Sequence, residues 1–491
     1  YEFQWAPIGN LGVDALVQLL APIFGLEPAV KLIILSIPMM TTAGLLLVAR
    51  EVHHRLPPTA IFSLSTRGLT PISAPTSPMP EHTRRRITSG ASPGSTERAI
   101  SPSRWSVFYS NHLFLFGFLI FSLSMALALL AFGLWLRLAR QGRLRLRAAL
   151  FVPISFVLYF AHTFGWGTLG LLAFSAEAVR QHDRGRGWFR SGVNAALHAS
   201  VMALPILLVL IWRSETTGAL TRNFFEWKLK WEWLYSAVRD RWEWFDIATV
   251  AVIPLLFLFA LFSPRLAFSR NLAFSVLVLA VCFVFLPWTM FGSAYADMRL
   301  APYMIALIPL SIRYSGETHL PTARTIAIIG VALVAIRLAA VTGSMLIAAQ
   351  DQEEKLEALD RIPRGARVVS LVGRECRRSA WGLPRLSHIP GMIIARREGF
   401  SNDQWQISGT NLLHIRFEEA GIFRQDPSQM VTPEWCRGKR RWSVNKALGA
   451  IPPGTFEYLW LVDVPPYNPE LTQGMTPVWK GPRSMLYRLQ R

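Results

Sequence analysis

Long apolar segments with few charges are the feature that most restricts the fold of this chain. A transmembrane helix needs about 17–25 apolar residues to cross a hydrocarbon core of about 30 Å. Only helices and closed barrels satisfy every backbone polar group in lipid. The sequence therefore predicts a polytopic all-α bundle, with spans at Val30–Val48, His112–Leu136, Asn194–Trp212, Ile247–Phe262, Leu272–Phe291 and Thr325–Ala349.

Two further segments extend this bundle. The apolar run Ala148–Ala178 is long enough for two short helices, and His162–Gly167 provides a break in its middle. Leu300–Ile312 contains two prolines and predicts a short kinked span. The visible chain then holds about 9–10 spans at the usual span length.

The charge composition supports the same class. Only 17% of the residues are charged, whereas a soluble protein carries about 25%. The 51 Lys and Arg exceed the 31 Asp and Glu, which gives a net charge of +20. This excess falls in short clusters between apolar runs, as in the cytoplasmic loops of membrane proteins, and we expect no nucleic-acid partner.

The arginine clusters predict the orientation of the spans. The loop after Leu136 contains five arginines and no acid, so we place it in the cytoplasm. Because successive spans cross the membrane in opposite directions, the loops that contain the arginines of 180–190, 265–270 and 313–324 are also predicted to be cytoplasmic. The His162 turn, the loop 213–246, the segment 292–299 and everything after Gln350 then lie outside.

The alternation fails between the first two spans. The span Val30–Val48, in the membrane segment 30–64, and the span that starts at His112 both run inward. An outward crossing must lie between them, and only the short apolar stretch Pro57–Leu64 is offered for it. Ser65–Ser106 is rich in Ser, Pro and Arg and is unable to cross a bilayer. This segment 65–106 is either a disordered linker or a frame-shifted stretch that replaces a lost helix, and the alternation favours the second interpretation.

The membrane bundle of 107–350 contains one segment of a different kind. Residues 223–246 combine charges with aromatic side chains and predict a helix in the membrane interface, or a substrate-lining role for some tryptophans such as Trp231. The aromatic residues are Phe224, Phe225, Trp227, Trp231, Trp233, Trp242 and Trp244.

Residues 351–491 have the composition of a soluble domain. We expect a small α/β domain on the external, periplasmic side, with a helix at Glu353–Asp360. Expected strands are Arg367–Val372, Met392–Ala395, Leu412–Phe417, Phe456–Val462 and Met485–Leu489. Cys376 and Cys436 both lie in this domain and can pair in an oxidising compartment.

No metal motif, P-loop, dinucleotide fingerprint or nucleophile elbow occurs in the sequence. The strongest candidate site is Tyr295–Tyr303, at the outer mouth of the short span. Asp297 is a candidate catalytic acid or base, Arg299 a candidate phosphate ligand beside a helix N-terminus, and Tyr295 a candidate lining residue. The alternative is an aspartate helix cap with Arg299 extending to the interface.

Three further acid–base candidates lie on the predicted external side. His162 occupies the apex of the helical turn and is either a functional imidazole or a hydrogen-bonded turn residue. Trp166 lies beside it and is a candidate substrate-lining residue. Glu2 and Asp14 belong to residues 1–29, which we interpret as a partial first periplasmic loop of a chain lacking its true N-terminus. Each is a candidate base or a solvated or capping charge.

The external sites and the C-terminal domain together resemble bacterial polytopic glycosyltransferases of the C superfamily (GT-C). The segments Glu2–Asp14, His112–Leu136, Ala161-His162 and Ala296–Tyr303 are similar to an uncharacterised alphaproteobacterial branch of that superfamily. The resemblance implies a multi-pass inner-membrane enzyme with a polyprenyl-phosphate sugar donor. The family's catalytic acid lies early in the first external loop, so Glu2 and Asp14 are the carried-over candidates.

The resemblance implies a specific chemistry. An external carboxylate accepts the proton of an acceptor hydroxyl, and a cation such as Arg299 stabilises the departing lipid phosphate. A divalent metal is a possible cofactor, although no ligand set is visible. The rival interpretation is a non-catalytic membrane protein, either a carrier of lipid-linked substrates or a scaffold, which includes an inactive truncated fragment.

Overall fold

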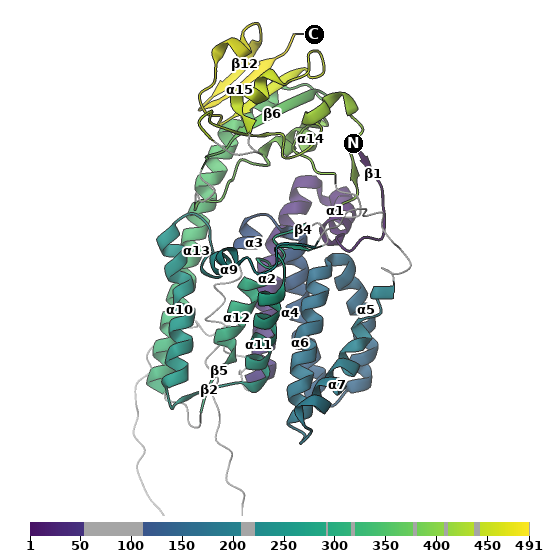
Figure 1. The fold of residues 1–491 in the computed structure, drawn as a ribbon, viewed down its shortest axis with the longest axis vertical. Helices are drawn as coiled ribbons and strands as arrows, with labels where there is room; N and C mark the ends of the chain where they lie inside the picture. Colours follow the sequence, from purple (N-terminus) through teal and green to yellow (C-terminus); the bar gives the residue numbers. More distant parts are fainter. Residues whose placement is uncertain are drawn as a thin grey trace, which may run out of the picture.

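The protein consists of a helical bundle and a smaller sheet-containing domain at one end of it (Figure 1). The computed structural model describes residues 1–53, 111–207, 221–290, 293–315, 320–376, 381–406, 411–436 and 442–490. The long helix α13 (Leu320–Leu356) runs along the edge of the bundle and leads into the C-terminal domain.

Within the described ranges, five helices are long and apolar enough to cross a membrane, namely α2, α4, α5, α10 and α13. This confirms the predicted apolar helical bundle with an α/β region after it. The helices of the bundle before α13 are α1 (Gly12–Phe24), α2 (Leu26–His53), α3 (His112–Leu115), α4 (Leu119–Arg140), α5 (Leu144–Ala161), α6 (Thr163–His182), α7 (Trp188–Ala199), α9 (Trp227–Tyr235), α10 (Glu243–Phe262), α11 (Arg270–Phe285) and α12 (Ala301–Ser311).

Helix α4 lies at the centre of the bundle, between α2 and α6. In α4, 72% of the most apolar 18-residue stretch is buried, whereas in α13 the corresponding share is 22%. Glycines allow the close approach of α2 and α4, because a Cβ on Gly44 would lie 2.7 Å from the Leu129 side chain and one on Gly133 would lie 2.5 Å from Leu47. Small residues at such crossings are typical of membrane helix pairs.

The break at His162 is confirmed, because α5 ends at Ala161 and α6 begins at Thr163. The single continuous span predicted over Asn194–Trp212 is wrong in its described part, because α7 ends at Ala199 and a short 3-10 helix ends at Met202. Residues 208–212 of that span lie outside the described residues. Pro205 follows in a turn, and a proline has no amide hydrogen to continue the helix.

Other helix boundaries also differ from prediction. The span His112–Leu136 is divided into α3 and α4 by Gly117, whose φ is +100°. In the interfacial segment, α9 covers only Trp227–Tyr235 before α10 starts at Glu243. The predicted separate helix Glu353–Asp360 is the end of α13 followed by a 3-10 helix, Glu357–Arg361.

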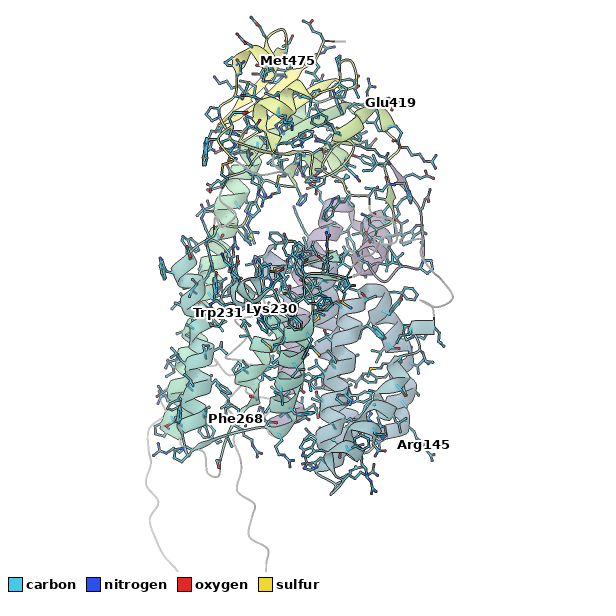
Figure 2. All side chains as sticks on the ribbon, in the orientation of Figure 1. Arg145, Lys230, Trp231, Phe268, Glu419 and Met475 are labelled. Atoms are coloured by element: carbon cyan, nitrogen blue, oxygen red, sulfur yellow. A yellow bond between two sulfur atoms is a disulfide. The ribbon has the colours of Figure 1, made fainter. Side chains whose placement is uncertain are left out.

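The arginine loops and the predicted external elements occupy opposite ends of the bundle. Strand β2 (Leu266–Phe268) pairs with β5 (Ile312–Tyr314) at the end away from the C-terminal domain. Figure 2 shows Arg145 and Phe268 at this end, with Glu419 and Met475 in the C-terminal domain at the other. The relative placement agrees with the alternation of spans predicted from the sequence, which put the His162 turn and the segment of α9 at the same end of the bundle as the C-terminal domain.

The C-terminal domain is built on a mixed seven-stranded sheet with the order β10-β9-β6-β11-β13-β12, in which β7 also pairs with β6. Alternate residues of the central strands enter two separate hydrophobic cores, one on each face. The strands are β6 (Arg367–Gly373), β7 (Phe400–Ser401), β9 (Met430–Thr432), β10 (Trp442–Ser443), β11 (Tyr458–Val462), β12 (Thr476–Gly481) and β13 (Ser484–Arg488).

Two predicted strands of this domain are wrong. Met392–Ala395 belongs to helix α14 (Met392–Arg397), because a short apolar run does not distinguish a buried helix from a strand. Leu412–Phe417 contributes only β8 (Leu413–His414), which pairs with β1 (Glu2–Phe3) outside the main sheet. A further short helix, α15 (Val444–Gly449), packs beside β10.

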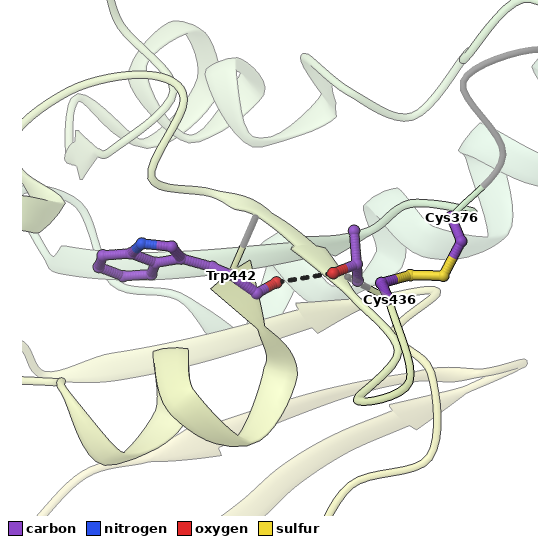
Figure 3. Close-up of a disulfide and its surroundings, with 4 residues drawn as sticks. Cys376, Cys436 and Trp442 are labelled. Carbon is purple, nitrogen blue, oxygen red and sulfur yellow. Dashed lines mark hydrogen bonds between the residues drawn. A yellow bond between two sulfur atoms is a disulfide. The ribbon is translucent and has the colours of Figure 1, made fainter. Parts of the chain in front are cut away.

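Cys376 and Cys436 form a disulfide, with their Cα atoms 5.5 Å apart (Figure 3). They follow β6 and β9, which are parallel neighbours, so both cysteines leave the sheet at the same edge. Beside the disulfide, the Thr432 hydroxyl donates to the Trp442 carbonyl at 3.0 Å. The predicted linker or frame-shifted segment 65–106 lies outside the described residues.

Candidate functional site

Arg299 lies at the domain-facing end of the bundle, in the turn between the hairpin β3–β4 (Thr289–Met290 and Ser293–Ala294) and α12. The residue is only 8% exposed. Its Nη2 donates to the Ser293 hydroxyl at 3.1 Å. Its guanidinium carbon lies 5.2 Å from the ring centre of Phe118 and 5.8 Å from that of Phe121, so two aromatic faces hold the cation.

No carboxylate among the described residues neutralises the charge of Arg299. In the part of the chain that the structure describes, no carboxylate forms an ion pair with it, and its buried Nε has no hydrogen-bond partner. Burial lowers the pKa of Arg299 to about 10, so the group remains protonated at neutral pH. A buried cation without a counterion is costly, and it favours an anion at this position.

His162 contributes a neutral hydrogen-bond donor next to this cation. It caps the N-terminus of α6, where its Nδ1 accepts a hydrogen bond from the Phe164 amide at 3.0 Å. Burial and the positive charge of Arg299 lower the pKa of this turn residue to about 3. Because Nδ1 acts as an acceptor, the neutral ring carries its proton on Nε2.

Phe121 joins the two polar groups. Its ring contacts the His162 ring edge-on, with centroids 5.7 Å apart, and lies under the Arg299 guanidinium. Helices α6 and α12 both begin here, so their positive N-terminal ends point to the same region. We call Phe118, Phe121, His162, Ser293 and Arg299 the Arg299 site.

Sequence reasoning missed the aromatic wall of this site. Phe118 and Phe121 are three residues apart at the start of a span, a spacing that places them on one helix face, but core packing explains that pattern equally well. Asn111 and Tyr303 extend the polar region, since the Asn111 amide donates to the Tyr303 hydroxyl at 3.3 Å. The Tyr303 ring contacts Phe121 at 5.8 Å.

Asp297 has a structural contact that occupies its carboxylate. The side chain is fully buried, and one oxygen lies 3.2 Å from Lys230 Nζ of α9. The other oxygen accepts the amide hydrogen of Met298 at 2.9 Å. Lys230 also donates to the carbonyl oxygens of Phe283 and Leu286, so the pair fastens α9 to the end of α11. This geometry favours Asp297 as a stabilising residue.

Asp14 is the carboxylate that remains available near the His162 turn. It lies in the first turn of α1, and no described residue forms an ion pair with it. The Leu11 amide donates to the Phe160 carbonyl at 2.7 Å, and the Thr163 amide donates to Gly9 at 3.1 Å. These bonds fix the start of α1 against the turn that carries His162, and burial raises the pKa of Asp14.

Glu2 belongs to a different neighbourhood. It lies in β1, which pairs with β8 of the C-terminal domain, and its carboxylate forms an ion pair with Arg416. The ion pair directs this carboxylate toward Arg416 of the C-terminal domain. The structure therefore does not bring Glu2 into the Arg299 site.

The three predicted lining residues have different positions. Tyr295 contacts Phe118 at 6.4 Å and adopts a positive φ of 64°, an uncommon conformation for a tyrosine. The Trp166 indole donates to the Met202 carbonyl at 2.7 Å and so ties α6 to the segment after α7. Trp231 is 69% exposed beside the buried Lys230, as Figure 2 shows, which suits an interfacial anchor.

A metal site is not evident at these residues. Within the described ranges, no group of three or more His, Cys, Asp or Glu side chains is arranged to hold a metal ion. The comparisons with known proteins identify no relative: no family model matches the chain, and neither a curated protein nor a solved structure is significantly similar to it.

Proposed function

We propose that this protein is a membrane glycosyltransferase that takes a sugar from a polyprenyl-phosphate donor at the domain-facing end of its bundle. The observation that carries this proposal is the buried, unneutralised Arg299. A phosphate supplies the missing negative charge, and the apolar bundle beside it suits a polyprenyl chain.

Asp14 is the proposed general base. Its carboxylate accepts the proton of the acceptor hydroxyl as that oxygen attacks the anomeric carbon of the sugar. The bond between the anomeric carbon and the phosphate oxygen breaks, and polyprenyl phosphate leaves as an anion. Arg299 and the Nε2 hydrogen of His162 stabilise the charge that develops on this leaving group.

The end of the bundle that holds the site would face the periplasm of a bacterial inner membrane. The arginine-rich loops at the other end support this orientation through the bias of Lys and Arg toward the cytoplasm. A fusion of a reporter to the C-terminal domain tests it directly, since a cytoplasmic C-terminus would reverse the orientation and remove the donor from the site.

The rival function is a non-catalytic one, a carrier of lipid-linked substrates or a scaffold for the C-terminal domain. Cells without the native gene would be complemented with the wild type, with Asp14→Asn, or with the exposed control Arg145→Gln. If the protein is a transferase, only the cells with Asp14→Asn should lose one glycan species and accumulate its lipid-linked donor, with the variant present at normal protein levels. Unchanged glycans with all three proteins would favour the carrier or scaffold.

A further inference from the structure

A polar cavity lies at the opposite end of the bundle from the Arg299 site. Its volume is about 420 Å³, within the usual range of about 300–1,000 Å³ for small-molecule sites. It is lined by the ends of α2, α4 and α6, by the start of α11 and by Arg313 of β5. Residues from five elements therefore enclose one space.

The cavity lining is rich in cations. Five arginines line it, namely Arg140, Arg180, Arg184, Arg270 and Arg313, together with the three carboxylates Glu51, Glu177 and Asp183. Arg147 lies outside the lining, and its Nη1 donates to the Glu177 carboxylate at 3.0 Å. Each lining carboxylate is ion-paired with a lining arginine, Glu51 with Arg140, Glu177 with Arg180 and Asp183 with Arg270. The five arginines therefore exceed the three carboxylates by two positive charges.

Unsatisfied donors accompany this charge. Trp135 lines the cavity and is only 1% exposed, yet its indole Nε1 has no acceptor in the described chain. Nη1 of Arg180 is also buried without a partner, while its other nitrogens bind Glu177. A buried donor without an acceptor costs about 1–3 kcal/mol, so these two donors of lining residues favour an acceptor group next to them.

Helix α11 adds a third feature. Its N-terminal residues Ser269, Arg270 and Asn271 line the cavity, and the Ser269 side chain makes no capping hydrogen bond. The helix has 16 residues, so its N-terminal amides and dipole favour a negative group. Arginine side chains and helix N-termini both bind phosphate oxygens in proteins.

We propose that this cavity binds a phosphate group, carried either by the headgroup of an anionic phospholipid or by a soluble phosphate compound. The arginines of a membrane protein's inner loops ordinarily serve orientation alone. Here they surround a cavity with unsatisfied donors, a geometry that orientation does not require. The site is separate from the proposed donor site at the other end of the bundle.

The test uses the full chain in nanodiscs and two double variants. Arg184→Gln with Arg270→Gln removes two lining cations, whereas Arg143→Gln with Arg145→Gln removes two exposed cations from the neighbouring loop outside the lining. Inorganic phosphate is titrated by calorimetry in phosphatidylcholine nanodiscs. In a second arm, co-purified lipid is measured after exchange into mixtures of phosphatidylcholine and phosphatidylglycerol.

The proposal expects saturable phosphate binding or preferential retention of phosphatidylglycerol by the wild type and by the control. The lining variant should bind about tenfold more weakly or lose the preference, which corresponds to about 1.4 kcal/mol. Phosphate binding indicates a soluble ligand, and retention alone indicates a lipid headgroup. The proposal is overturned if the wild type shows neither, or if both double variants weaken equally, since bulk charge then explains the effect.

A conservative variant guards against misfolding. Trp135→Phe keeps the aromatic packing and removes only the indole donor. It should keep the elution profile and melting temperature of the wild type while phosphate binding weakens several-fold. Wild-type affinity in this variant would show that the indole does not contact the ligand, and it would contradict the proposal that phosphate binds in this cavity.

Discussion

Arg299→Gln is the most direct test of the donor site. The substitution keeps a hydrogen-bonding side chain but removes the charge and one arm of the guanidinium fork. A hydrogen bond to a charged group contributes about 1.5–3 kcal/mol, so the loss of one such bond raises the Kd for a phosphate by about 10- to 150-fold. This estimate is a lower bound, because the remaining long-range attraction is lost as well.

The assay is thermal unfolding in phosphatidylcholine nanodiscs with added polyprenyl phosphate. At a concentration of 100 times Kd, the ligand stabilises the wild type by about 2.7 kcal/mol. If the variant binds about 100-fold more weakly, the same concentration stabilises it by only about 0.4 kcal/mol. The variant Arg145→Gln, whose side chain is exposed at the other end of the bundle, should respond like the wild type.

The stability of the wild type and of Arg299→Gln without ligand tests the reasoning further. Arg299 has no carboxylate partner in the described chain, so its removal should leave the unliganded stability unchanged or raise it. A loss of about 3–5 kcal/mol without ligand would mean that Arg299 belongs to a buried ion pair. Full ligand stabilisation in the variant would also contradict the proposed phosphate contact.

Three other substitutions have contrasting outcomes. Arg337→Met should lower the free energy of unfolding by about 3–5 kcal/mol, measured in denaturant, because it leaves the buried Asp246 without its ion-pair partner. Asp14→Asn should abolish transfer without loss of stability at neutral pH, since burial already disfavours the ionised carboxylate in the folded state. In the wild type, transfer should fall as pH drops through the raised pKa of Asp14, and a pH–rate profile checks this. Cys376→Ser with Cys436→Ser should cost about 4 kcal/mol in the chain-entropy estimate for a 60-residue separation, and reductant should then lower the melting temperature of the wild type alone.

The bundle could be predicted because lipid imposes a simple rule on the sequence. A long uncharged run has few alternatives to a helix, so α2, α4, α10 and α13 appear where hydropathy places them. Boundaries were less accurate because local features end helices. Pro205 follows the early end of α7, and Gly117 separates α3 from α4, where hydropathy alone continues through both positions.

The candidate site was only partly accessible to the same reasoning. Arg299 and His162 were identified because polar residues at span ends are unusual. Their meeting around Phe121 was not, since the two residues are 137 positions apart and only packing brings them together. The pairing of Asp297 with Lys230 was equally hidden, because no local pattern relates α9 to the turn before α12.

The sequence by itself determined the apolar helices, the clustering of the bundle's arginines in short loops and the change to a less apolar, strand-containing C-terminal region. Each follows from the free energy of transferring side chains between water and lipid, which depends on composition over a short window. The tertiary structure decided which charges are neutralised. It paired Asp297 with Lys230 and Glu2 with Arg416, and it gave Arg299 no counterion among the described residues. It also fixed the start of α1, the helix that contains Asp14, against the His162 turn. Ion pairs and such contacts depend on distances between segments that composition does not encode.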